Sequence, residues 1–112
     1  MTVEKPSYHH GDLRAALLVA GESVLAETGM EGFSLRRVAR EVGVSHSAPA
    51  HHFGDTQGLL VALATEGFRR FLASMQARQS GCGTQDAGDM LVASGLGYLD
   101  FTTASPALFK LM

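Results

Sequence analysis

Residues 45–52 bring together side chains that can form hydrogen bonds with a nucleic acid. Three of the five histidines of the chain lie in this stretch, together with two serines. An imidazole can donate or accept a hydrogen bond and titrates near an ordinary pKa of about 6.5, and a hydroxyl suits either type of base. On a helix, His46 and Ser47 are expected to contact base edges, with Ala50 and His51 beside them on the outer face. For any single one of these residues, a position on a solvated helix face that binds no ligand is a nearly equal alternative.

Catalytic or metal chemistry is not indicated by the residue pattern. The pairs His9-His10 and His51-His52 suggest metal ligands, but adjacent residues on a helix point about 100° apart and do not easily share an ion. The sequence has no cysteine pair and no His-x-x-x-His spacing. Gly81 lies in a glycine-rich stretch that lacks the strand and helix context of a phosphate-binding loop. We therefore predict no catalytic residues, no metal site, no cofactor and no enzymatic activity.

The elements that must position the polar stretch are two short helices joined by a tight turn, over residues 34–53. Ser34 is expected to cap the first helix, because its hydroxyl can accept a hydrogen bond from a free backbone N–H. Gly43 can adopt the positive φ that the turn requires. Ser45 is expected to cap the second helix, which we place over residues 45–52. The apolar face of the first helix is formed by Leu35, Val38, Ala39 and Val42.

Further helices are predicted on both sides of this corner. A flexible arm over residues 1–9 should precede a helix over residues 11–28, which ends at Gly29. A long helix should run from residue 55 or 56 to about residue 79. Its expected buried stripe consists of Leu59, Leu60, Leu63, Phe68, Phe71, Leu72 and Met75.

The C-terminal part is divided by a glycine-rich break at residues 80–83. A helix is expected over residues 85–103, although its glycines lower its intrinsic stability by about 1 kcal/mol each. Close packing, a cavity beside a ligand or a loose helix would each explain those glycines. Ser105 and Pro106 are expected to cap and begin a last helix.

From about residue 13 to residue 63 the chain resembles the N-terminal domain of the TetR family of transcriptional regulators. The matching segments are Leu17-Leu18-Val19-Ala20, Val24, Leu25, Gly29, Gly32-Phe33-Ser34-Leu35-Arg36, Val38-Ala39-Arg40-Glu41-Val42-Gly43-Val44-Ser45, His52-Phe53 and Leu59-Leu60. Weaker matches lie at the two ends, at residues 8–14 and 106–112. The resemblance implies an all-α fold, in which a three-helix DNA-binding domain is followed by a longer helix and the beginning of a helical ligand-binding and dimerisation domain.

The resemblance also assigns roles to individual positions. It implies that the second corner helix enters the major groove. Arg36 and His52 match positions that contact the DNA backbone, although Arg36 could instead face solvent and His52 could simply cap the helix end. The positions implied to bind DNA are Arg36, Ser45, His46, Ser47, Ala50, His51, His52 and Thr56.

Three residues depart from the family pattern. Most members have a tyrosine in place of Ala50 and a lysine in place of Thr56, and both usually contact phosphates. Their absence is expected to reduce the salt-dependent part of DNA affinity. Pro49 replaces an aliphatic residue and should make the second corner helix short or bent.

Composition sets the outer limits of this interpretation. The chain has 112 residues, 46% of them hydrophobic, which suits one small domain or one domain with part of a second. The formal net charge is −2, whereas a DNA-binding domain usually has a basic surface. Three arginines nevertheless cluster over residues 36–40. The single cysteine, Cys82, excludes an internal disulfide and suits a reducing cytoplasm. No apolar stretch is long enough to span a membrane, so no membrane partner is expected.

These observations predict a cytoplasmic, ligand-responsive repressor that reads a palindromic operator in double-stranded DNA as a homodimer. Residues 1–56 would form the DNA-binding domain. Residues 57–112 would form a connecting helix and part of a regulatory domain that binds a small-molecule effector and continues beyond this chain. The alternative is a helical module that uses the same corner to bind another protein without binding DNA.

Overall fold

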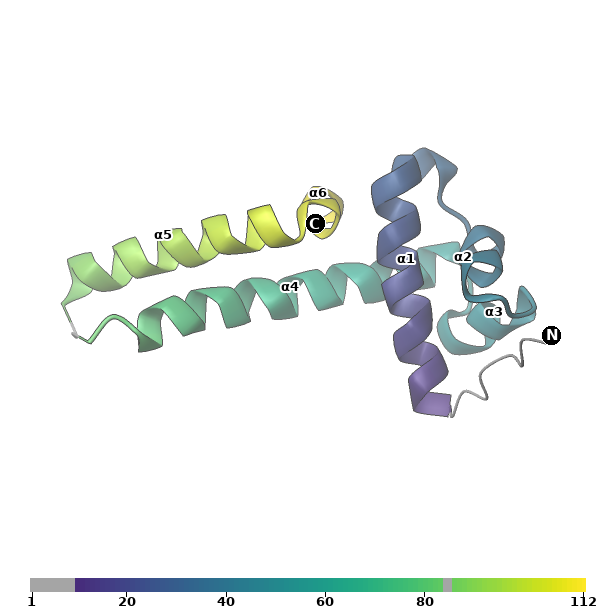
Figure 1. Cartoon of the computed structure of the whole chain (residues 1–112), viewed down its shortest axis with the longest axis horizontal. Helices are drawn as coiled ribbons and strands as arrows, with labels where there is room; N and C mark the ends of the chain where they lie inside the picture. Colours follow the sequence, from purple (N-terminus) through teal and green to yellow (C-terminus); the bar gives the residue numbers. More distant parts are fainter. Residues whose placement is uncertain (1–9, 84–85) are drawn as a thin grey trace, which may run out of the picture. The chain divides into compact units, whose positions relative to one another are not determined.

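The computed structural model describes residues 10–83 and 86–112, and the expected N-terminal arm at residues 1–9 lies outside these ranges. All regular structure in the described ranges is α-helical, which confirms the predicted fold class (Figure 1). The helices are α1 (His10–Gly32), α2 (Leu35–Val42), α3 (Ser47–Phe53), α4 (Thr56–Ser80), α5 (Ala87–Ala104) and α6 (Pro106–Leu111). None of them, over the described residues, is long and apolar enough to cross a membrane.

The chain divides into two compact units, and the division falls inside α4. The first unit extends to Leu63 and the second begins at Ala64. The first unit contains α1, α2, α3 and the first two turns of α4. The second contains the rest of α4 together with α5 and α6.

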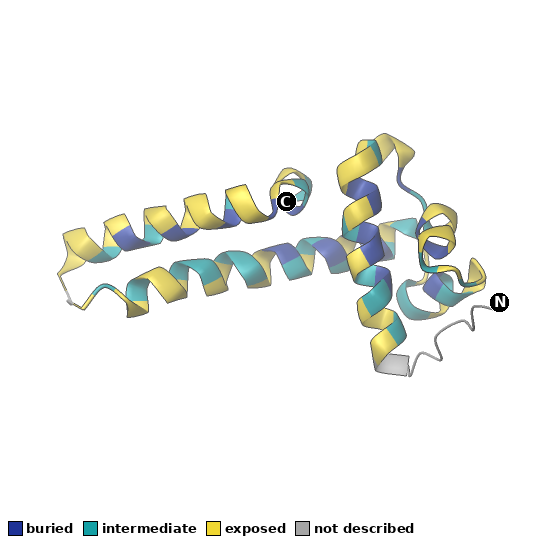
Figure 2. Cartoon of the chain, viewed as in Figure 1, coloured by how far each residue is buried: buried dark blue, intermediate teal, exposed yellow. Residues whose placement is uncertain are grey.

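The core of the first unit is formed by apolar side chains that α1, α2 and the start of α4 direct toward one another. Gly21 of α1 allows a close approach to α4, because a Cβ atom there would lie 3.3 Å from Leu63 Cδ1. The buried side chains are Leu17, Ala20, Val24, Leu25, Phe33, Val38, Ala39, Pro49, Leu59, Leu60 and Leu63 (Figure 2). Each predicted helix of this unit therefore contributes to a common core.

The first predicted helix break is confirmed. The bounds of α1 extend to Gly32, but regular helical geometry is interrupted at Gly29, which has φ 69° and ψ −178°. The hydroxyl of Thr28 donates a hydrogen bond to the carbonyl of Val24 at 2.9 Å in the turn before the break. Gly29 therefore ends the regular part of α1 by adopting a backbone conformation that favours glycine.

The ends of α2 also follow the sequence prediction. Ser34 Oγ accepts a hydrogen bond from the backbone N–H of Arg37 at 3.1 Å, so this serine is the N-cap. Gly43 has φ 85° and ψ 31°, and its N–H donates to the carbonyl of Ala39 at 2.8 Å. A serine cap and a left-handed glycine thus define α2 and set the direction of the turn.

The prediction that Ser45 caps the next helix is wrong. The N-cap position of α3 is His46, and no side-chain hydrogen bond caps this helix. The Ser45 hydroxyl lies 2.9 Å from that of Ser47, while its carbonyl accepts a hydrogen bond from the N–H of Ala48 at 3.0 Å. The N-cap position falls on His46, with φ −68° and ψ −11°, and α3 begins at Ser47, two residues later than predicted. Pro49 then lies in the first turn, where a missing N–H costs no helical hydrogen bond.

In the second unit, α4 and α5 run side by side (Figure 1). Gly97 of α5 lies against α4, and a Cβ atom there would lie 2.5 Å from Met75 Cα. Arg78 on α4 donates two hydrogen bonds to the carboxylate of Asp100 on α5, at 2.6 and 2.9 Å. Of the explanations for the α5 glycines, close packing is therefore the one that holds at Gly97.

Two residues of the predicted buried stripe on α4 are exposed. Phe68 and Leu72 have exposed fractions of 55% and 54%, whereas Phe71 and Met75 are half-buried. The buried position on this part of α4 is Gly67, whose missing side chain leaves room for Leu108 and Met112. The prediction assumed that the large apolar side chains of α4 are buried, whereas the closest packing is at Gly67, which has no side chain.

Aromatic contacts connect α5 to α4 in this unit. The Phe71 ring lies 5.5 Å from Phe101 and 5.6 Å from Tyr98, centroid to centroid. Ser105 precedes Pro106 as predicted, but its hydroxyl does not cap α6; it accepts a hydrogen bond from Arg70 at 3.2 Å. The end of α5 is therefore attached to α4 by both apolar and polar contacts.

Candidate nucleic-acid interface

The outer face of α3 presents the polar side chains that the sequence singled out. His46, Ser47 and His51 are exposed. Ser47 and His51 are four residues apart, so they lie on the same side of the helix. The first requirement for reading DNA, an accessible row of hydrogen-bonding groups, is met by these three residues.

The inner face of α3 differs from the prediction at one position. Ala50 was expected to face outward, but it is half-buried. Pro49 is fully buried instead, together with the half-buried Ala48 and Phe53. Pro49 and Phe53 are four residues apart, so they lie on the same side of the helix, and this side faces the core.

The C-terminal end of α3 carries a row of rings. The ring centroids of His51 and His52 are 5.6 Å apart, and those of His52 and Phe53 are 6.1 Å apart. His52 is half-buried. The guanidinium of Arg14, from α1, lies over the Phe53 ring with its central carbon 5.2 Å from the centroid. This contact connects α1 to the end of α3.

Positive charge is concentrated on α2. Arg36, Arg37 and Arg40 are exposed there. Arg37 forms an ion pair with Glu27 of α1 at 3.0 Å. Arg36 and Arg40 are four residues apart and form no ion pair with another described residue. These two arginines can therefore bind an anion such as a phosphate without first breaking an ion pair within the protein.

Thr56 is the first residue of α4 and is half-buried. The preceding residue, Asp55, accepts a hydrogen bond from the N–H of Gly58 at 2.7 Å and so caps the helix. The carboxylate places a negative charge beside Thr56. This position is less suited to a phosphate than the lysine found in most members of the resembled family.

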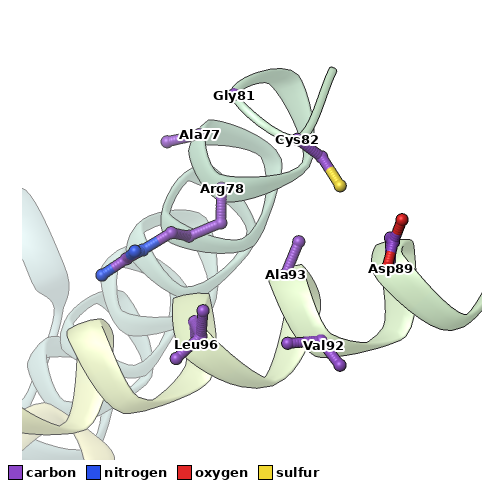
Figure 3. A pocket seen from close by; sticks show the side chains of 8 residues that line it. All are labelled: Ala77, Arg78, Gly81, Cys82, Asp89, Val92, Ala93 and Leu96. Carbon is purple, nitrogen blue, oxygen red and sulfur yellow. The ribbon is translucent and has the colours of Figure 1, made fainter. Parts of the chain in front are cut away.

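The second unit contains a pocket of about 400 Å³ between the end of α4 and the beginning of α5 (Figure 3). It is lined by Ala77, Arg78, Gly81, Cys82, Asp89, Val92, Ala93 and Leu96. Cys82 is half-buried. No group of three His, Cys, Asp or Glu side chains in the described ranges is arranged to hold a metal ion.

Comparison with known proteins identifies the first unit. Residues 17–63 match the family model of bacterial regulatory proteins, tetR family. The HTH-type transcriptional repressor AcnR of Corynebacterium glutamicum is 42% identical over 53 residues, which are 47% of this chain and 28% of that protein. An HTH-type transcriptional repressor of Mycobacterium tuberculosis is 33% identical over 85 residues, 76% of this chain and 44% of that protein. Residues 17–63 therefore form a domain of the tetR family of bacterial regulatory proteins.

Solved structures share the fold of this chain. A protein of unknown function from Rhodococcus sp. RHA1 is 44% identical and has a TM-score of 0.80, covering 97% of this chain and 55% of that one. The TetR family regulator PfmR of Thermus thermophilus has a TM-score of 0.71 at 20% identity, over 86% of this chain and 51% of PfmR, which shows the shared fold. This chain spans about half or less of the length of the relatives it matches.

Sequence reasoning missed the contact between Arg14 and Phe53. Arg14 lies near the start of α1, almost forty residues before Phe53, and no periodic pattern connects the two. It also missed Gly54, which ends α3 with φ 85° and donates its N–H to the carbonyl of Ala50 at 2.8 Å. The glycine after His52-Phe53 was the available signal for that helix end.

Proposed function

We propose that this protein is a sequence-specific DNA-binding transcriptional regulator, acting as a repressor. The observation that carries the proposal is the exposure of His46, Ser47 and His51 on the helix that follows the Gly43 turn. In a helix-turn-helix this second helix lies in the major groove. The relatives that are named as transcriptional repressors favour DNA binding over the alternative of a protein-interaction module.

The roles of the residues follow from their chemistry. His46 and Ser47 would contact base edges, because imidazole and hydroxyl groups match the donors and acceptors of the major groove. Arg36 and His52 would contact phosphates and fix the register of the helix without reading sequence. Ser45 and His51 flank these contacts on the exposed side. Ala50 and Thr56, both half-buried, would contribute less than the tyrosine and lysine of other members.

Two copies of the chain would act together on a palindromic operator in the cytoplasm. A symmetric dimer places its two reading helices about one helical turn of DNA apart. A small-molecule effector would bind in the regulatory part and favour a spacing that no longer fits successive major grooves. The pocket near Cys82 falls in the size range of small-molecule sites. Measuring the melting temperature of the protein with and without candidate effectors would test that assignment.

Selection of bound duplexes from a random-sequence pool tests the function directly. We expect the wild-type protein to enrich a palindromic sequence. The double variant His46→Ala, Ser47→Ala should lose about 1–3 kcal/mol of discrimination for each base contact removed. The variant Gln76→Ala, at an exposed position of the second unit, is the matched control and should enrich the same sequence as the wild type. Failure of the folded wild-type protein to enrich any sequence would contradict the proposal.

A further inference from the structure

Arg14 has a fixed and accessible guanidinium at the edge of the proposed interface. The residue is exposed, and its guanidinium carbon lies 5.2 Å from the centroid of the Phe53 ring. A cation over an aromatic face is attracted by the negative charge of the π system. Phe53 is half-buried and ends α3, so the ring that receives Arg14 is itself held by the core. The guanidinium thus has a preferred position despite its exposure.

The electrostatic surroundings of Arg14 differ from those of Arg37. Arg37 is partly neutralised by Glu27 at 3.0 Å. For Arg14, the described part of the chain places no carboxylate within ion-pair distance. Its contact with Phe53 is made to an aromatic ring and not to an oxygen acceptor, and a guanidinium carries five N–H donors. Those donors suit the oxygen atoms of a phosphate group.

The contact places this cation near the end of α3 that carries His52. The His52 ring lies 6.1 Å from the Phe53 ring, on which Arg14 rests. His52 is the residue proposed to contact a phosphate. Two phosphate-binding groups, one from α3 and one from α1, would therefore lie near the same Phe53 ring.

We infer that Arg14 is a phosphate-contacting residue of the DNA interface, and that Phe53 is the positioning residue that holds it. This inference rests on the proposed DNA-binding function. It also accounts for the departures at Ala50 and Thr56, because a cation from α1 supplies backbone affinity that a tyrosine and a lysine supply elsewhere. Arg14 contributes affinity for any sequence, while His46 and Ser47 contribute selectivity.

Salt dependence of binding to a labelled duplex of mixed sequence tests this role without knowledge of the operator. Removal of one phosphate-binding cation should make the slope of log K against log salt concentration less negative by about 0.9. We expect Arg14→Ala to show this change and to bind several-fold more weakly at low salt. Arg14→Lys keeps the charge and should retain most of the slope. Arg69→Ala removes an exposed arginine of the second unit and should leave the slope unchanged.

A double-mutant cycle tests the positioning role of Phe53. Phe53→Leu removes the aromatic face and keeps an apolar side chain of similar size. We expect it to weaken binding in the wild-type background and to have little further effect in the Arg14→Ala background, because the two residues act as one unit. Circular dichroism melts of all variants distinguish this result from loss of folding.

The outcomes separate this inference from the proposed function. Salt-sensitive binding by the wild type with an unchanged slope for Arg14→Ala would overturn the role of Arg14 and leave the DNA-binding function standing. A lower melting temperature for Arg14→Ala with an unchanged slope would likewise show that the contact only supports the fold. Absence of salt-sensitive binding by the folded wild type would contradict the proposed function itself.

Discussion

Two small residues, Ser34 and Gly43, determine where α2 begins and ends. The first satisfies a free N–H through its hydroxyl at 3.1 Å, and the second takes φ 85°, which side chains with a Cβ rarely adopt. Both features depend on backbone chemistry that is local in sequence. This locality is why they could be predicted from residue types alone.

Replacement of Ser34 by alanine should lower the free energy of unfolding by about 1 kcal/mol, because the N–H of Arg37 is then left without its acceptor. The variant Ser34→Asp retains a side-chain acceptor and should keep most of the stability. Urea unfolding followed by circular dichroism measures both. Equal stability of Ser34→Ala and wild type would show that the cap contributes nothing.

At Ser45 the same local reasoning failed. A serine caps a helix only if its hydroxyl accepts from a free backbone N–H, and the Ser45 hydroxyl instead lies 2.9 Å from the Ser47 hydroxyl. The burial of Pro49 against the core sets the phase of α3. That burial depends on tertiary packing, which a serine in a favourable sequence position does not reveal. The exposure of His46, Ser47 and His51 was predicted correctly, since the displacement of the helix start leaves them outward.

At the scale of helices, the contact between α4 and α5 depends on glycine. Gly97 lies where a Cβ atom would meet backbone atoms of Ser74 and Met75 at 2.5–2.8 Å, so the neighbouring helix itself would have to move. Gly95, two residues earlier, faces open space. The sequence identified both glycines as unusual for a helix but could not separate them, because only the partner helix distinguishes their faces.

This difference predicts opposite effects for two similar substitutions. Gly97→Ala should destabilise the second unit by about 1–3 kcal/mol through overpacking. Gly95→Ala should stabilise α5 by up to about 1 kcal/mol, since alanine favours helix and meets no obstacle. Thermal unfolding of the two variants compares them directly. A lower melting temperature for Gly95→Ala than for Gly97→Ala would contradict the packing of α5 on α4.

Glu66 gives α4 a stability that depends on acid pH. Hydrogen bonding from Arg69 at 2.6 Å, joined by Arg70 at 3.1 Å, outweighs partial burial and lowers the pKa of Glu66 to about 2. In the unfolded chain the ordinary value is 4.5, so this contribution is complete above about pH 4.5 and is lost as the pH falls toward 2. Because Arg69 is largely exposed, solvent screens the ion pair, and the contribution of Glu66 to the free energy of unfolding should be only about 1 kcal/mol.

The variant Glu66→Gln should therefore be less stable than wild type by about 1 kcal/mol at pH 7. The difference should shrink below pH 4.5 and vanish only below about pH 2, where the wild-type carboxylate becomes protonated in the folded state. Urea unfolding across this pH range tests the prediction. The matched variant Glu41→Gln, at an exposed position outside the ion pairs of the described residues, should show no such convergence.

At the scale of the whole molecule, one helix belongs to both compact units. The first two turns of α4 complete the core around α1 and α2, and the remainder packs with α5 and α6. The sequence predicted one continuous helix there, and the structure confirms it. It could not predict which large side chains of α4 stay exposed, because Gly67 packs on residues that lie some forty positions later.

The charge of the molecule is consistent with a modest affinity for DNA. A net charge of −2 gives no general attraction to a polyanion, so binding must depend on a few placed cations. Arg36, Arg40 and Arg14 are exposed on the unit that carries α3, and the described ranges show no carboxylate paired with them. The dominant interactions should therefore be short-range contacts to phosphates rather than a long-range field.

Titration of the full chain with its selected duplex at two salt concentrations tests the DNA-binding function most directly. The fluorescence anisotropy of the labelled duplex reports the bound fraction. We expect the affinity to fall steeply as salt increases, by a factor that grows with the number of phosphates contacted, and to be weaker for a duplex of unrelated sequence. A folded protein that binds neither duplex, or binds them equally at both salt concentrations, would contradict the assignment of α3 as a DNA-reading helix.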